Sequence, residues 1–269
     1  MRDFSEEELE RFSRHIILEE VGIEGQEKII NSKVLVIGAG GLGSPIALYL
    51  SAAGVGEIGI IDGDVVDLSN LQRQIIHTTE EVGTPKVESA KRKMLAINPH
   101  IKVNTYQTMV SAESILNLIA PYDFVIDGTD NFATKFLIND ACVLANKPYS
   151  HGGILRFTGQ TMSVDPHKSA CYACAFNAPP PPNEVPTCSS AGILGAVAGI
   201  LGTIQATEAL KYITNVGTPL FNSLLSFEAK SMTFRTVRFK RNPKCRVCGD
   251  NGIKELIDYE QAVCENKYD

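Results

Sequence analysis

The sequence has no excess of positive charge and no long apolar run. Its 25 Lys and Arg residues against 31 Asp and Glu residues give a formal net charge of −6 at pH 7. Proteins whose main partner is nucleic acid carry a basic surface, so we expect no nucleic acid. The longest uncharged apolar run, Ala191 to Thr207, is shorter than the ~20 residues of a membrane span. We interpret it as a glycine-rich helix packed inside the core.

An apolar signal-peptide core is also missing from the N-terminal segment, which is acidic from Met1 to Glu8. Seven cysteines, an odd number, then indicate a reducing compartment, where thiols bind metals or act in catalysis. We therefore expect a cytoplasmic protein that does not use a membrane.

A glycine-rich segment follows the first predicted strand. The apolar run Val34 to Ile37 is typical of a buried parallel strand, and the next six residues fit G-x-G-x-x-G. Apolar residues then recur at helical spacing until Gly54 ends the helix. Such a turn presents unpaired N–H groups and a helix N-terminus to a phosphate. We predict a nucleotide site at Gly38, Gly40, Gly41 and Gly43.

Acidic residues follow two later predicted strands. The run through Ile58 and Ile61 ends at Asp62, about 20 residues after the glycines, where an acid can accept from ribose hydroxyls. A further strand from 124 to 127 is followed by Asp130 and Asn131. Because strands and helices alternate up to residue 150, we expect a parallel sheet with helices on both faces. Its carboxyl edge should hold the site.

Two cations lie near the same predicted edge. Arg73 belongs to the polar segment after the second strand, and Lys86 opens a helix behind Pro85. A dehydrogenase needs little positive charge at the pyrophosphate, whereas two cations and a carboxylate suit a triphosphate with Mg²⁺. We expect ATP as the nucleotide. The alternative is an NAD-dependent oxidoreductase on the same glycine turn.

The pattern changes after Gly152. Residues 154–164 predict a strand or a hairpin around Gly159, residues 191–213 a helix, and residues 220–227 and 232–239 alternating strands. At the other end, residues 5–20 predict one amphipathic helix that starts with a capping box of Ser5 and Glu8, while Gly22 and Gly25 break the chain. We predict a single α/β domain over residues 1–269, with a Rossmann-like half (1–150) continued by antiparallel strands into one mixed sheet.

Four of the seven cysteines form two C-x-x-C pairs. Cys171 and Cys174 form one pair, and Cys245 and Cys248 form the other. Four thiolates suit tetrahedral Zn²⁺, and four protein ligands leave no open position, so the zinc would be structural. The alternative is a disulfide within each pair.

Several motifs together resemble the MoeB/ThiF/HesA group, the bacterial relatives of ubiquitin-activating enzymes. They are Gly38-Ala-Gly-Gly-Leu-Gly-Ser-Pro45, Asp62-Gly-Asp64, Asp67-Leu-Ser-Asn-Leu-Gln-Arg-Gln74, Gly83-Thr-Pro-Lys86, Asp127-Gly-Thr-Asp-Asn131, Asn139-Asp-Ala-Cys142 and the two C-x-x-C pairs. The resemblance implies ATP-dependent adenylation of the C-terminal glycine of a small ubiquitin-like sulfur carrier of the MoaD or ThiS type. The carrier ends in Gly-Gly, pyrophosphate is released, and the product is ready for thiocarboxylate formation.

The same resemblance implies roles for individual residues. Asp62 would hold the ribose, Asn70, Arg73 and Lys86 the phosphates, and Asp130 the Mg²⁺. Asp64, Gln74 and Asn131 belong to the same nucleotide-binding motifs. Arg14 would reach in from the partner subunit of a homodimer. Lys135 departs from the family, which commonly has Arg there, and lysine lacks the planar fork of arginine.

Sulfur transfer raises separate expectations. The chain ends without a rhodanese-type sulfurtransferase domain, so a separate persulfide donor is expected. Cys188 precedes a predicted helix, whose dipole lowers the pKa of a thiol. In ThiF-like relatives the matching cysteine links to the carrier; in MoeB-like relatives it is not required, and here both readings stay open. A non-catalytic adaptor and a tRNA-modifying dehydratase of the same superfamily are further alternatives.

Overall fold

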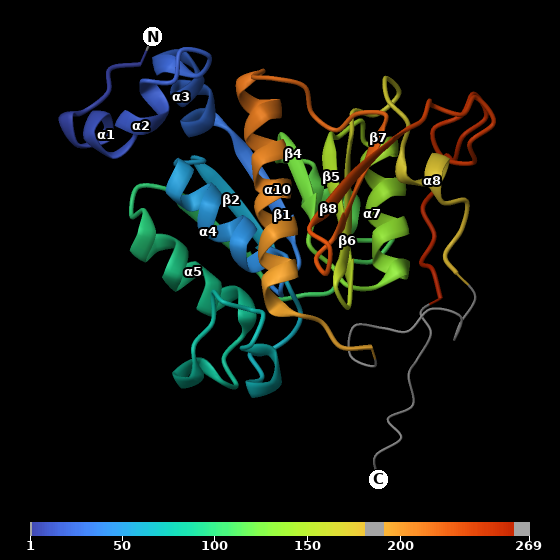
Figure 1. Ribbon diagram of the computed structural model, residues 1–269, viewed down its shortest axis with the longest axis horizontal. Helices are drawn as coiled ribbons and strands as arrows, with labels where there is room; N and C mark the ends of the chain where they lie inside the picture. Colours follow the sequence, from blue (N-terminus) through green and yellow to red (C-terminus); the bar gives the residue numbers. More distant parts are fainter. Residues whose placement is uncertain (1, 181–190, 261–269) are drawn as a thin grey trace.

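A mixed eight-stranded sheet forms the centre of the protein (Figure 1). The computed structural model describes residues 2–180 and 191–260. The strand order is β3-β2-β1-β4-β5-β6-β7-β8; pairing is parallel from β3 to β5 and antiparallel from β5 to β8. The strands are β1 (Lys33–Ile37), β2 (Glu57–Ile61), β3 (Lys102–Tyr106), β4 (Phe124–Asp127), β5 (Tyr149–Leu155), β6 (Thr158–Val164), β7 (Ser223–Glu228) and β8 (Thr233–Arg238). The predicted α/β class with one mixed sheet is confirmed.

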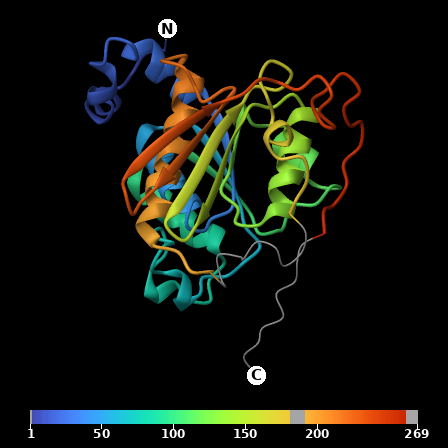
Figure 2. The same ribbon diagram turned by 45° about the vertical axis from the view of Figure 1, so that its right-hand side comes forward.

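Helices cover both faces of the parallel part of the sheet (Figure 2). Side chains from α4, α5 and α10 fill one core, and side chains from α6 and α7 fill the other. The helices are α1 (Glu6–Arg11), α2 (Ser13–Ile16), α3 (Gly22–Asn31), α4 (Gly43–Ala53), α5 (Lys86–Ile97), α6 (Ile115–Ile119), α7 (Phe132–Leu144), α8 (Tyr172–Ala175) and α10 (Gly195–Thr214), with short 3₁₀ turns η1 (Leu68–Asn70) and η2 (Thr79–Glu81).

The glycine-rich helix α10 lies against α4, as predicted for a helix inside the core. A Cβ atom on Gly202 would lie 2.6 Å from the carbonyl oxygen of Leu42, so only glycine allows this approach. The helix begins at Gly195, four residues later than predicted at 191. Within the described residues, no helix combines the length and apolarity needed to cross a bilayer.

Two local predictions were wrong, and a third was right in kind but not in the position of its turn. Residues 5–20 do not form one helix: the capping box is present, but the chain turns at Phe12, which is 5% exposed and buries its ring. Gly22, with φ +57°, is the first residue of α3, and Gly25 lies inside it, so a helix and not a break precedes the first strand. The hairpin expected over residues 154–164 is present as β5 and β6, but its turn lies at residues 156–157, where Arg156 has φ +55°, and Gly159 lies within β6. Tertiary packing of Phe12 overrides the local helical pattern.

Candidate functional site

A polar pocket lies where the parallel strands β1, β2, β3 and β4 end. The strand order in the sheet reverses between β1 and β4. Open α/β sheets bind ligands outside the carboxyl ends of the strands at such a reversal. The predicted nucleotide residues that line it are Gly38, Gly40, Gly41, Asp62, Asp64, Asn70, Arg73, Gln74, Lys86, Asp130 and Asn131. The structure therefore brings together, in one place, segments that are far apart in the sequence.

The glycine-rich turn forms one wall of this pocket. Gly38 has φ +100°, a conformation that favours glycine. Gly43 is the first residue of α4 and does not line the pocket: a Cβ atom there would collide with the carbonyl oxygen of Gly38. Gly43 therefore serves the close packing of turn and helix, while Gly40 and Gly41 face the pocket.

Asp62 connects the end of β2 to the glycine-rich turn. Its carboxylate accepts hydrogen bonds from the N–H groups of Ala39 (2.8 Å) and Asp64 (2.9 Å). Lys86 lies next to it, with Nζ 2.7 Å from Asp64 Oδ2 and 4.0 Å from Asp62 Oδ1. The Lys86 side chain is 6% exposed, whereas that of Asp64 is 67% exposed. A buried cation thus lies at the pocket, paired with an acid that can rotate into solvent.

The segment after η1 supplies the second cation. Asn70 Oδ1 accepts from Gln74 Nε2 (2.6 Å) and from Arg73 Nη2 (3.4 Å), and Arg73 Nη1 donates to the carbonyl of Ser69 (3.2 Å). A Cβ atom on Gly195 would lie 3.1 Å from Arg73 Cα, so the start of α10 packs against this segment. The guanidinium is consequently held at the pocket wall.

Asp130 is an exposed residue on the loop between β4 and α7. The next residue, Asn131, caps α7 by accepting from the N–H of Thr134 (2.8 Å). On the other side, Asp127 accepts from the N–H and the hydroxyl of Thr129 (3.0 and 2.6 Å). The loop is therefore fixed at both ends, and Asp130 extends from it into the pocket.

Lys135 is an internal cation and not a pocket residue. Its Nζ lies 3.0 Å from Asp127 Oδ2 and donates to the carbonyls of Thr129 (2.7 Å) and Gly152. His151 Nδ1 contacts the same carboxylate at 2.9 Å. Burial would raise the pKa of Asp127, but the Lys135 cation and the His151 hydrogen bond hold it well below its usual range. The lysine thus supports the Asp130 loop from behind.

Sequence reasoning missed two groups of residues at this site. Thr108, Met109 and Val110 line the pocket directly after β3, and Ile154 and Ile193 close it from β5 and from the segment before α10. The signal for the first group was available, because β3 is a parallel strand whose carboxyl end meets the same edge. The apolar pair comes from the second half of the chain, which no strand-end rule places there.

Other predicted residues lie away from the pocket. Arg14, on α2, is exposed and does not line it. Cys188 lies outside the described residues. The Arg14 role in a second subunit and the Cys188 role in sulfur transfer therefore stay predictions.

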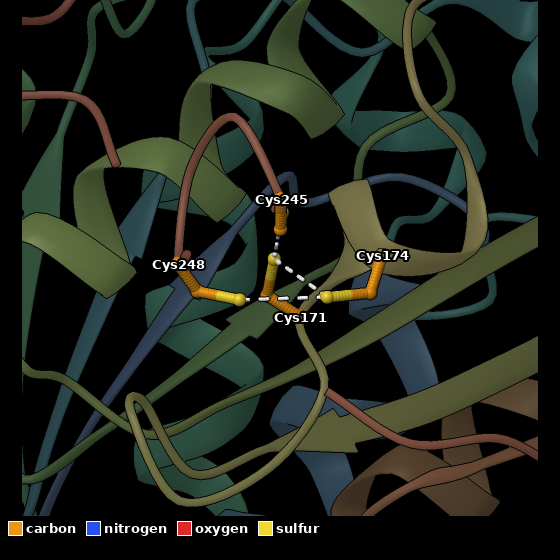
Figure 3. Close-up of side chains that lie close together, drawn as sticks. All are labelled: Cys171, Cys174, Cys245 and Cys248. Atoms are coloured by element: carbon orange, nitrogen blue, oxygen red, sulfur yellow. Dashed lines mark hydrogen bonds between the residues drawn. The ribbon is translucent and has the colours of Figure 1, made fainter. Parts of the chain in front are cut away.

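The two C-x-x-C pairs meet in space (Figure 3). All four sulfur atoms lie within 4.8 Å of one another and point toward a common centre. Neighbouring sulfurs are separated by 3.9 Å (Cys171 and Cys174), 3.7 Å (Cys171 and Cys245) and 3.4 Å (Cys174 and Cys248). The pairing of the middle of the chain with its C-terminal segment is as predicted.

This geometry fits a tetrahedral metal. Zn–S bonds of about 2.3 Å separate the sulfurs of a tetrahedron by about 3.8 Å, which is close to the observed distances. The N–H groups of Asn242 and Val247 approach Cys174 Sγ (3.5 Å) and Cys245 Sγ (3.4 Å), as donors to thiolates do. The cluster can hold a metal ion such as Zn²⁺.

Comparison with known proteins identifies a family and relatives to which this chain is similar. Residues 12–247 match the ThiF family. The sulfur carrier protein adenylyltransferase of Thermus thermophilus is 44% identical over 267 residues, covering 97% of this chain and 98% of that protein. The SAMP-activating enzyme E1 of Haloferax volcanii is 44% identical over 257 residues, covering 95% of both chains. The probable adenylyltransferase/sulfurtransferase MoeZ of Mycobacterium tuberculosis is 45% identical, covering 96% of this chain but 65% of MoeZ.

Solved structures agree with this placement. E. coli MccB in complex with AMPCPP and MccA superimposes with a TM-score of 0.81 at 25% identity, covering 92% of this chain and 76% of MccB. MccB with ATP gives a TM-score of 0.76 at 25% identity, covering 89% of this chain and 74% of MccB. The match covers residues 12–247, including the glycine-rich turn, the cation segment and the first C-x-x-C pair, and so this chain is a member of the ThiF family.

Proposed function

We propose that this protein uses ATP to adenylate the C-terminal glycine carboxylate of a small ubiquitin-like sulfur carrier ending in Gly-Gly. The relatives named above support this proposal: one is a sulfur carrier protein adenylyltransferase, one is an activating enzyme E1, and the third is a probable adenylyltransferase/sulfurtransferase. The reaction is a substitution at phosphorus. The carrier carboxylate forms a bond to the α-phosphorus, the bond between the α- and β-phosphates breaks, and pyrophosphate leaves.

One observation carries this proposal. Lys86, Arg73 and Asp130 line the same pocket as the glycine-rich turn. Two cations and an acid at a phosphate-binding turn fit a triphosphate better than a dinucleotide, whose pyrophosphate the turn alone can hold. This composition favours ATP over the NAD alternative.

The chemistry of each pocket side chain determines the role that we propose for it. Asp62 accepts from the ribose hydroxyls while it keeps the Ala39 N–H. Lys86 leaves the exposed Asp64 and, with Arg73, neutralises the charge that develops on the departing pyrophosphate. The carrier carboxylate is itself the nucleophile, so positioning and charge stabilisation suffice and no protein nucleophile is needed for this step. Once joined to AMP, the carbonyl carries a good leaving group that sulfur can displace.

Asp130 is the proposed Mg²⁺ ligand. Hard cations prefer carboxylate oxygen, and Mg²⁺ keeps several waters while binding one or two protein carboxylates and the substrate phosphates. Asp130 is exposed at the pocket and forms no ion pair with the pocket cations among the described residues, which fits that mode. When bound, Mg²⁺ would neutralise phosphate charge. The cysteine cluster is the proposed Zn²⁺ site, where four protein ligands leave no position for substrate.

The second half of the chain, residues 151–269, is the proposed carrier-binding part, and residues 1–150 form the nucleotide-binding part. A homodimer in which Arg14 acts on the partner subunit's pocket is part of the proposal. Its test mixes Arg14→Ala and Asp130→Ala proteins. Mixed dimers then contain one intact site, and part of the activity should return. Proven subunit exchange without any return of activity would exclude a role in trans.

Sulfur enters in a later step, from a separate persulfide donor in this proposal. Cys188 is the proposed residue for a covalent link to the carrier at that step, and it is dispensable for adenylation. Cys188→Ala should leave pyrophosphate exchange unchanged. If thiocarboxylate also forms at the normal rate on this variant, as read by mass spectrometry of the carrier C-terminus, Cys188 has no role.

The experiment for the main proposal is ATP–pyrophosphate exchange. Exchange should need both Mg²⁺ and a carrier ending in Gly-Gly, and Asp130→Ala should abolish it while the fold survives. Exchange at the wild-type rate in Asp130→Ala, or without any carrier, would overturn the assignment.

A further inference from the structure

The buried side chain of His77 contacts the glycine-rich turn from outside the pocket. The residue is 5% exposed and does not line the pocket. Its Nε2 lies 3.0 Å from the carbonyl oxygen of Ala39, and its Nδ1 lies 2.8 Å from Ser89 Oγ. The imidazole ring thus bridges the turn after β1 and the helix α5.

The hydrogen-bond partners fix which ring nitrogen carries a proton. A carbonyl oxygen can only accept, so Nε2–H of His77 donates to Ala39. Ser89 has a single hydroxyl proton: when it is donated to Glu81 Oε2, Nδ1–H of a protonated ring donates to Ser89 Oγ, and when it is donated to Nδ1 of a neutral ring, the hydrogen bond to Glu81 is lost. The Nε2–H bond to Ala39 is present in both states. Burial lowers the pKa of His77, and the bond to the Ala39 carbonyl opposes this effect.

On the side of the His77 ring away from Ala39, Ser89 belongs to a charged network around Glu81. Ser89 Oγ lies 2.8 Å from Glu81 Oε2, and the Glu81 carboxylate pairs with Arg92 (3.0 Å) and Lys93 (3.4 Å) of α5. The other charged groups near the ring are Lys86 and Asp62. The ring is therefore attached to a rigid helix and not to a mobile loop.

The geometry of the peptide bond between Ala39 and Gly40 links the imidazole ring to the pocket. In a trans peptide, the carbonyl and the next N–H point in opposite directions. A carbonyl of Ala39 held by His77 on the outside aims the N–H of Gly40 toward the inside, where Gly40 lines the pocket. The N–H of Ala39 is held in turn by Asp62.

We propose that His77 is a positioning residue of the nucleotide site, whose Nε2–H holds the Ala39 carbonyl and keeps the glycine-rich turn in its phosphate-binding shape. The inference rests on the proposed function of the pocket as an ATP site. It assigns no chemical step to His77.

The test is binding of MgATP to the full chain, measured by isothermal titration calorimetry. His77→Phe keeps a ring of similar size but removes the donor, and we expect it to weaken MgATP binding about tenfold. His77→Gln places an amide N–H near the position of Nε2 and should restore most of the affinity. The control is His100→Gln, an exposed histidine paired with Glu7 and outside the pocket lining, which should bind as the wild type does.

The outcomes separate this inference from the proposed function. A wild-type protein that does not bind MgATP refutes the ATP site, and this inference with it. Wild-type binding together with equal binding by His77→Phe, even at a lowered melting temperature, makes His77 purely structural and overturns the inference alone. Histidine ¹⁵N spectra of the wild type at about pH 8 provide a check that needs no variant. A proton on Nε2, in the neutral Nε2–H tautomer or in the protonated ring, supports the inference, and the neutral Nδ1–H tautomer contradicts it.

Discussion

The nucleotide pocket and the cysteine cluster are stabilised in different ways. In the pocket, polar groups already have partners within the protein: Lys86 pairs with Asp64, and Asn70 binds Gln74. In the cluster, four sulfurs crowd within 4.8 Å, and the described N–H groups that reach them are those of Asn242 and Val247. The pocket can keep its shape without a ligand, whereas four thiolates this close repel one another unless an ion, proposed above as Zn²⁺, neutralises them.

Removing the metal should therefore have the largest effect. The cluster joins the C-terminal segment to the middle of the chain, and structural Zn²⁺ contributes about 10–16 kcal/mol of apparent binding free energy in small zinc domains. We expect Cys245→Ser to lose the metal and to lower the melting temperature by at least about 10 °C. Elemental analysis and calorimetry measure both.

A matched control uses a cysteine outside the cluster. Cys142 is fully buried in the core, so Cys142→Ala removes a thiol of the same kind without touching the cluster. This variant should keep about one equivalent of metal. Wild-type protein without metal, or with a disulfide inside each pair, would contradict the account of the cluster.

Breaking the buried ion pair between Lys135 and Asp127, behind the pocket, should have the second largest effect on stability. Lys135→Met leaves Asp127 buried without its cation, which costs about 3–5 kcal/mol of unfolding free energy. The double variant Asp127→Asn/Lys135→Met removes both charges and should be more stable than the single one. Urea denaturation measures this difference; equal stability of all three proteins would show that the pair is not needed.

Removing the pocket cation should lower activity but not stability. Lys86→Ala should reduce ATP–pyrophosphate exchange about 10²–10³-fold, the usual loss of one charge-stabilising group. Lys91→Ala, on the same helix but outside the pocket lining, is the control and should keep the wild-type rate. A Lys86→Ala protein that is unfolded, or that exchanges normally, would contradict the expected difference between the nucleotide pocket, where a change lowers activity, and the cysteine cluster, where a change lowers stability.

The smallest expected effect concerns pH. Burial opposes ionisation of Glu81, but hydrogen bonds from Ser89 and Arg92 lower its pKa to about 2 from 4.5. A lowered pKa contributes stability above the unfolded value, and this stability is lost as pH falls from 4.5 toward 2. Glu81→Gln should flatten the dependence of melting temperature on pH in this window. An unchanged slope would exclude Glu81 as a contributor.

Sequence patterns predicted the parallel half of the sheet and the strand ends that meet at its carboxyl edge, because both depend on local order along the chain. A strand, a glycine turn and a helix place Gly40 and Gly41 without long-range information, and each strand end brings its acid to the same edge. Asn131 shows the limit of this reasoning: its side chain caps α7, a role that a nucleotide motif does not reveal.

The remaining differences come from tertiary contacts that a local pattern does not encode. Phe12 leaves the helical pattern because its ring is buried, and Lys135 turns inward because Asp127 is there to pair with it. His77 carries no motif at all. Its place behind Ala39 follows from the packing of α5 against the turn, so only the structure could show it.

The most direct test of the central claim is intact-mass spectrometry of the carrier. A ubiquitin-like carrier ending in Gly-Gly, incubated with the wild-type protein, Mg²⁺ and ATP, should gain the mass of one AMP. The same carrier without its last glycine should gain nothing, and Lys86→Ala should give little product with the intact carrier. A carrier that stays unmodified with a wild-type protein that binds ATP, or one that is modified at another position than its C-terminus, would contradict the account.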